Sequence, residues 1–206
     1  TAYLDGTVGV GGDAAGDTIV NVESLEGSSH DDRLGGRVGA ETLSGGAGDD
    51  VLLGSAGADT LDGGAGMDTA DYSASATAVT VNLDGSVSIG GDAAGDTLAN
   101  IERVIGSAGN DTLNGSGAAD TLQGGAGNDV LSGDAGNDTL LGEAGDDVIA
   151  GGAGADAIDG GAGSDTVTYA ASSAGVDAGL DGGAQDRKST RLNSSHVSES
   201  RMPSSA

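Results

Sequence analysis

A nine-residue repeat dominates the chain between positions 106 and 168, which divide into seven units with nothing left over. The units read GSAGNDTLN, GSGAADTLQ, GGAGNDVLS, GDAGNDTLL, GEAGDDVIA, GGAGADAID and GGAGSDTVT. Each begins with Gly, has Asp at its sixth position and has Leu, Ile or Val at its eighth. A short period kept over so many units predicts a stacked solenoid, in which each unit repeats one supersecondary element.

A second, less regular run of five units covers residues 27–71. Its first unit has His30 where Gly is expected, its second has Glu41 at the Asp position, and its last has Ala70 at the apolar position. The remaining units follow the pattern of the longer run. We therefore expect two blocks of the same structure.

A longer repeat lies over the short one. The segment LDGTVGVGGDAAGDTIVNVESLE near the start reappears, shifted by 79 positions, from Leu83. A third copy begins at Tyr169, 97 positions after Tyr72. The two shifts differ by 18, or two units, which indicates that two units form one layer. The chain then divides into a spacer (1–26), five units (27–71), a spacer (72–105), seven units (106–168), the start of a third spacer (169–184) and a tail (185–206).

The spacers give weaker local signals. Val79, Val81 and Leu83 alternate with polar residues, which predicts a short strand. A short helical turn is expected over residues 96–105, with Asp96 as its cap.

The tail differs in character from the rest of the chain. It holds four of the seven basic residues and the single Pro. Its sequence RKSTRLNSSHVSESRMPSSA looks like read-through of a cloning or sequencing adapter, and the rival interpretation is a disordered Ser-rich linker.

The composition limits the possible partners. The chain has a net charge of -26, 42 Gly, no Cys, no Trp and no Phe. Nucleic acids and anionic membranes need a basic surface, so neither is expected as a partner, and membrane insertion is not expected because long apolar runs are lacking. Cations are the natural partners of such a chain. A disordered acidic chain is the alternative for the metal-free state. Because it starts at Thr1 without Met, we expect a fragment of a larger chain.

The units resemble the RTX nonapeptide, Gly-Gly-x-Gly-x-Asp-x-U-x with U large and apolar. The resemblance covers residues 27–71 and 106–168 directly. It implies an all-β fold, a right-handed parallel β-roll with about 18 residues per layer, and calcium as the bound ion. It also implies a secreted, extracellular or cell-surface bacterial protein exported by a type I system.

Stacking at two units per layer places the sixth-position carboxylates in columns. Successive layers lie about 4.8 Å apart, so these charges repel unless a dication lies between them. Calcium accepts six to eight oxygen ligands in flexible geometry, whereas magnesium keeps its waters and zinc prefers His or Cys. We count up to about eight ions, with Glu41 and the Asp32 position beside His30 the least regular. The predicted metal ligands are Asp32, Asp50, Asp59, Asp68, Asp111, Asp120, Asp129, Asp138, Asp147, Asp156 and Asp165.

The other repeated positions have simpler roles. The eighth residues form two facing apolar ladders, one from Leu113 to Val167 and one from Leu122 to Ile158. Fifth-position Asn and Asp residues are expected to complete turns or face solvent. His30 and His196 are isolated and are expected on the surface.

Three functions are compatible with this pattern. The first is a non-catalytic calcium-binding β-roll of an exported protein that is unfolded without calcium and folds outside the cell, next to neighbouring domains. The second is the module of an RTX enzyme such as a metalloprotease, lipase or epimerase; no HExxH or GxSxG motif occurs here, so this stretch itself is expected to be inactive. The third is the repeat region of a large adhesin.

Overall fold

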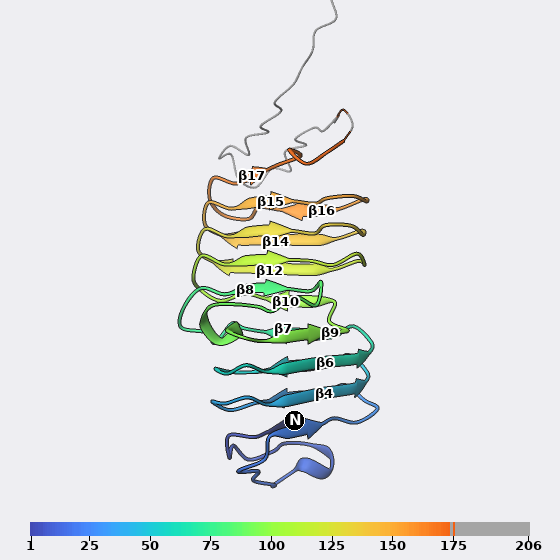
Figure 1. Ribbon diagram of the computed structural model, residues 1–206, viewed down its shortest axis with the longest axis vertical. Coiled ribbons are helices and arrows are strands. Elements are labelled where there is room, and N and C mark those ends of the chain that lie inside the picture. Colours follow the sequence, from blue (N-terminus) through green and yellow to red (C-terminus); the bar gives the residue numbers. More distant parts are fainter. Residues whose placement is uncertain (174, 176–206) are drawn as a thin grey trace, which may run out of the picture.

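The computed structural model describes residues 1–173 and 175. They form an elongated stack of short parallel strands (Figure 1). The tail at 185–206 and the third spacer beyond Ser173, apart from Gly175, lie outside the described residues. Within the described part no helix is long and apolar enough to cross a membrane.

The strands belong to three sheets. The eight-stranded sheet contains β1 (Ala2–Tyr3), β3 (Arg33–Gly35), β5 (Val51–Leu53), β7 (Thr69–Asp71), β10 (Arg103–Ile105), β12 (Thr121–Ala126), β14 (Thr139–Ala144) and β16 (Ala157–Asp159). The five-stranded sheet contains β8 (Thr80–Asn82), β11 (Thr112–Asn114), β13 (Val130–Ser132), β15 (Val148–Ala150) and β17 (Thr166–Val167). The four-stranded sheet contains β2 (Ser24–Glu26), β4 (Thr42–Ala47), β6 (Thr60–Ala65) and β9 (Thr97–Ala99).

The predicted layer of two units is confirmed by the strand register. Leu113 pairs with Leu131, and Leu122 with Leu140, each across parallel strands. The eighth-position side chains point inward and are almost fully buried, with Leu113 and Leu122 both 0% exposed. At the end of the stack Ile158 and Val167 are half-buried. Two units therefore make one turn around a thin apolar core, and the solenoid is parallel throughout its sheets.

The second spacer corrects one prediction. Residues 96–105 do not form a helical turn, because they contain strands β9 and β10. Leu98 and Val104 point into the core at 4% and 0% exposure, continuing the ladders of β6 and β7. Gly and β-branched residues disfavour a helix here, and the neighbouring turn offers strand partners instead. Among the described residues of this spacer, the helical structure is confined to the 3-10 turn η2 (Gly91–Ala93).

The second spacer forms a turn of the solenoid with an added segment, which we call the excursion. At the junction of β7 and β10, Asp68 bonds to Glu102 across a sequence separation of 34, whereas regular neighbours such as Asp111 and Asp129 are separated by 18. The added length contains β8 and η2. The first spacer has the same parts, since η1 (Gly12–Ala14) occupies the matching place in the longer repeat. The eight-stranded sheet runs through the second spacer, so the two runs of units are parts of one continuous stack.

Candidate metal centre

Acidic side chains stand one above another beside the strands, in three columns. Each member comes directly before a strand, so the strand register fixes its place. Column 1 contains Asp32, Asp50, Asp68, Glu102, Asp120, Asp138 and Asp156. Column 2 contains Glu23, Glu41, Asp59 and Asp96. Column 3 contains Asp111, Asp129, Asp147 and Asp165.

One oxygen of most stacked aspartates is used to join the layers. The backbone N–H of Asp111 donates to Oδ1 of Asp129 at 2.8 Å, and that of Asp129 donates to Oδ1 of Asp147 at 2.8 Å. The same bond joins Asp32 to Asp50 at 2.7 Å and Asp120 to Asp138 at 2.9 Å. The carboxylates are thus held in fixed positions by the main chain of the previous turn.

The second oxygen of many of these aspartates is buried and has no hydrogen-bond partner. A buried carboxylate oxygen without a donor is costly, so such groups mark a place for a ligand. Hard oxygen atoms fixed in this way suit calcium. The atoms concerned are Oδ2 of Asp50, Asp59, Asp68, Asp129, Asp138 and Asp147.

The backbone φ of the second residue in each unit distinguishes two loop conformations. In eight units it has a left-handed φ between 68° and 107°, and we call these open units. Their second residues are Gly46, Ser55, Gly64, Gly125, Asp134, Glu143, Gly152 and Gly161. In the first two units of each run the second residue is not left-handed, and we call these closed units. Their second residues are Ser28, Arg37, Ser107 and Ser116.

The two loop conformations differ in the hydrogen bonds that they donate to the sixth-position carboxylate. In closed units with serine at this position, the second residue donates its backbone N–H to Oδ2, as Ser28 does to Asp32 at 2.7 Å and Ser116 to Asp120 at 2.6 Å. All six aspartates with a free Oδ2 belong to open units. A left-handed φ at Ser55 costs about 1–2 kcal/mol, which indicates that the open loop serves a purpose other than its own stability.

Glycine at the first position leaves room beside the free oxygen. A Cβ on Gly124 would fall among the carboxylate of Asp129 and, at 2.9 Å, the carbonyl oxygen of Gly142 in the next turn. A Cβ on Gly45 would likewise approach Asp50 and, at 2.6 Å, the carbonyl oxygen of Gly63. Any side chain here would fill a small space walled by carboxylate and carbonyl oxygens. Within residues 1–173 and 175 no three acidic or His side chains form a metal-binding group, so backbone carbonyls must complete any site.

Burial disfavours the ionised form of the column carboxylates and so raises their pKa values. Burial raises the pKa of Asp59 to about 7 and the pKa of Asp129 to about 6, and neighbouring column carboxylates add to both increases. The pKa of Asp96 is raised to about 6, also chiefly by burial. Burial raises the pKa in the same direction at Asp50, Asp68, Asp120, Asp138 and Asp147. A bound dication would remove this penalty by stabilising the ionised form.

The fifth-position residues lie outside the candidate sites. Asn110 accepts from the backbone N–H of Asn128 at 2.9 Å, and Asn128 accepts from that of Asp146 at 2.9 Å. They therefore complete a turn and join successive layers at the surface. His30 is exposed, and His196 lies outside the described residues.

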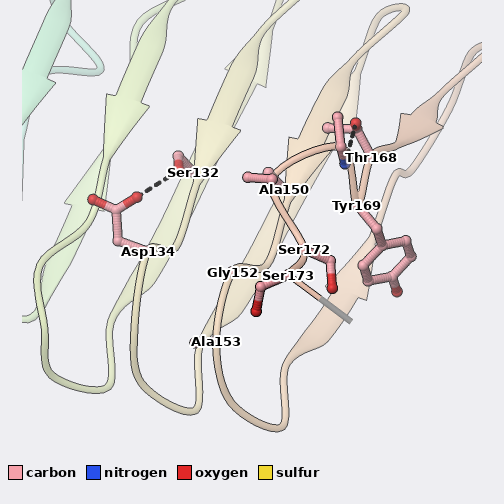
Figure 2. Close-up of a pocket in the computed structure, with 11 residues that line it drawn as sticks. Ser132, Asp134, Ala150, Gly152, Ala153, Thr168, Tyr169, Ser172 and Ser173 are labelled. Atoms are coloured by element: carbon pink, nitrogen blue, oxygen red, sulfur yellow. Dashed lines mark hydrogen bonds between the residues drawn. The ribbon is translucent and has the colours of Figure 1, made fainter. Parts of the chain in front are cut away.

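A separate pocket lies near the end of the stack. Figure 2 shows it between the turn at Ser132 and Asp134, the next turn at Gly152, and the segment from Thr168 to Ser173. Ser132 donates to Asp134 at 2.9 Å beside it. No column aspartate lines this pocket, so it is distinct from the candidate metal sites.

Besides Glu41, which stands at the sixth position of its unit, three column residues are absent from the sequence-based set. Asp96 precedes Thr97-Leu98 as Asp59 precedes Thr60-Leu61, and this shared Asp-Thr-Leu triplet is the signal that could have identified it. The backbone N–H of Asp59 donates to Oδ1 of Asp96 at 2.8 Å. Glu23 and Glu102 each precede a spacer strand, and Glu102 accepts from the backbone N–H of Asp68 at 2.9 Å. Glu23 and Glu102 keep the nine-residue spacing to Asp32 and Asp111, but their segments lack the glycines of the repeat, and Asp96 alone falls outside the spacing.

Comparison with models of known protein families gives a match to this chain. The RTX calcium-binding nonapeptide repeat (4 copies) matches residues 35–70, 96–131, 105–140 and 132–167, a little over half of the chain. The second match begins at Asp96, in agreement with its place in column 2. A search among curated proteins found no relative.

Proposed function

Because this chain belongs to the family of RTX calcium-binding nonapeptide repeats, we propose that its solenoid binds several calcium ions between successive turns and depends on them to fold. The observation that carries the proposal is the buried, unpartnered Oδ2 in open units such as that of Asp129. Ions bound there would supply the positive charge that the acidic columns lack.

The proposed ligands are the sixth-position carboxylates together with backbone carbonyls of the glycine loops. The open-unit residues Asp50, Asp59, Asp68, Asp129, Asp138 and Asp147 are the strongest, since each has a free oxygen. Asp156 and Asp165 share the open loop conformation. Asp32 and Asp111 accept hydrogen bonds from serine donors. Asp120 also accepts from a serine through its Oδ2 but keeps a buried Oδ1 without a partner.

Calcium binding is expected to contribute a large share of the stability. For sites with dissociation constants of about 0.1 mM, as in extracellular modules, millimolar calcium stabilises the fold by about 1.4 kcal/mol per site. Several such sites together approach the roughly 5–15 kcal/mol of a whole domain. We propose that the chain folds outside the cell, where calcium is plentiful, as a non-catalytic module of a secreted or cell-surface protein.

The test is far-ultraviolet circular dichroism of the whole chain in chelator, in calcium and in magnesium. We expect strand signal in millimolar calcium, its loss in chelator, and little recovery with magnesium at equal concentration. Isothermal titration then measures the number of ions. A chain equally folded in chelator and calcium, with no heat of calcium binding, would overturn the proposal.

A further inference from the structure

Column 2 begins with a pair of acidic residues that differs from every regular step of the stack. Glu23 and Glu41 lie in successive turns, and the backbone N–H of Thr42 donates to the carbonyl oxygen of Glu23 at 2.9 Å, as that of Thr60 does to Glu41. Glu41 is buried, with its side chain 0% exposed. At regular steps a cation is proposed between such neighbours. The Glu23 side chain is 67% exposed, so the charge that most needs a partner in this pair is that of Glu41.

The guanidinium of Arg37 bridges the two carboxylates. Its Nη2 lies 3.0 Å from Oε1 of Glu23, and its Nε lies 3.4 Å from Oε1 of Glu41. Arg37 is the second residue of its unit and carries a permanent positive charge. Its unit is closed, yet both carboxylate oxygens of Glu41 are buried without a hydrogen-bond partner, so the charge of Glu41 is met by the ion pair with Arg37 and not by a hydrogen bond.

The equivalent position in the second run supports this interpretation. Ser116, like Arg37, is the second residue of the second unit in its run, and it donates its backbone N–H and its hydroxyl to Oδ2 of Asp120 at 2.6 and 3.0 Å. At both places a group from the second residue of the unit faces the carboxylate. Arg37 differs because it meets Glu41 through an ion pair without a hydrogen bond, and because it donates a hydrogen bond to Glu23, the acidic residue of the turn below.

We propose that Arg37 is a built-in cation that takes the place of calcium at the step between Glu23 and Glu41. This inference rests on the proposed calcium function of the other steps. It reduces by one the number of calcium ions that an unbroken acidic column would take. It also makes the first turn of column 2 independent of calcium, so that a closed turn exists on which the calcium-dependent turns can stack.

The experiment counts bound calcium by native mass spectrometry of the whole chain. The double substitution Arg37→Gly with Glu41→Asp converts the unit into GGVGADTLS, which has the regular glycine, aspartate and apolar positions. We expect this variant to bind one more ion than the parent. Arg33→Gln is the matched control, because Arg33 pairs with Asp71 at 3.2 Å outside the columns, and its count should equal that of the parent.

A second variant keeps the inference testable if the first does not fold. Arg37→Gln should lower the melting temperature strongly at low calcium and less at high calcium, because calcium can then enter beside the freed carboxylates. A loss that is constant at all calcium concentrations, or a folded double variant with an unchanged ion count, overturns the role of Arg37. A parent that binds no calcium overturns the proposed function instead.

Discussion

The first layer of each run and the layers above it have nearly the same sequence but differ in the hydrogen bonds that their carboxylates accept. In the closed units Ser107 and Ser116 donate hydrogen bonds to Asp111 and Asp120. In the open units above them the second residue turns left-handed, and Asp129 and Asp138 keep a buried Oδ2 without a donor, whereas in Asp120 the oxygen without a donor is Oδ1. The comparison indicates that the need for a cation comes from the loop conformation and from the presence of a repeat unit below.

The largest expected effect contrasts Asp129→Asn with Asp111→Asn. Asp129 has column neighbours both above and below, so its substitution weakens two proposed calcium steps and should cost about 3 kcal/mol of unfolding free energy in millimolar calcium. Asp111 begins column 3 and is bound by Ser107, so its substitution should cost about half as much. Urea unfolding at fixed calcium measures both. Equal losses would remove the distinction between open and closed units.

A smaller effect is expected when a substitution disfavours the left-handed backbone of an open loop. Gly125 has φ +100, and a Cβ there would meet the carbonyl oxygen of Ser107. Gly125→Ala should therefore cost about 2 kcal/mol, from the left-handed backbone and the close contact. Gly117 has nothing within 4 Å of an added Cβ, and Gly117→Ala should change stability by less than about 0.5 kcal/mol. Thermal unfolding in calcium separates the two, and similar losses would show that the open loop is not constrained.

Tyr72 tests how much a hydrogen bond from the protein itself to a buried carboxylate oxygen contributes to stability. Its hydroxyl donates to Oδ2 of Asp96 at 2.8 Å, and both residues are buried. Tyr72→Phe leaves that oxygen without a donor and should cost about 1.5 kcal/mol. The loss should show in urea unfolding at saturating calcium. Tyr169→Phe is the control, because Tyr169 begins the third spacer but is 36% exposed. A loss equal to that of the control would mean that the hydrogen bond contributes nothing.

A prediction of a different kind is the pH dependence of the calcium-free chain. Folding raises the pKa of Asp59 to about 7 and those of Asp96 and Asp129 to about 6, above the value of about 3.9 in an unfolded chain. The folded state then binds more protons between pH 4 and 7, so its stability is greatest below pH 4 and is lost as pH rises through 6 to 7. Circular dichroism without calcium should show a larger folded fraction at pH 5 than at pH 8. In calcium the trend should reverse, because protons compete with the metal. A folded fraction that is independent of pH without calcium would contradict the raised pKa values.

Much of the fold could be predicted because every regular unit carries the same residue types at the same positions. The eighth residue fixes the inward ladder, and the two-unit layer follows from the spacers, so the pairing of Leu113 with Leu131 follows from the sequence alone. Strand β9 could not be predicted this way, because it depends on pairing with β6 across a separation of 37 residues, and local propensity gave no such information. Strand β10 could have been predicted, since Val104 lies nine positions before Leu113 and 18 before Leu122, with which it pairs.

The open and closed loops could not be predicted either. Serine is the second residue at both Ser55 and Ser107, yet only Ser55 is left-handed. The difference lies in what is stacked below. Ser55 lies above the unit of Arg37, whereas Ser107 begins a run above a spacer turn. A single sequence position therefore takes its conformation from its neighbour in the turn below.

The first run contains five units, and five is an odd number when two units complete a turn. As a result β1 opens the eight-stranded sheet by pairing with β3, whereas its counterpart β8 opens the five-stranded sheet by pairing with β11. The module of spacer and run thus repeats as a screw with a half rotation. Its two excursions, carrying η1 and η2, follow strands of different sheets, so whether the unit count is odd or even determines the sheet from which each spacer departs.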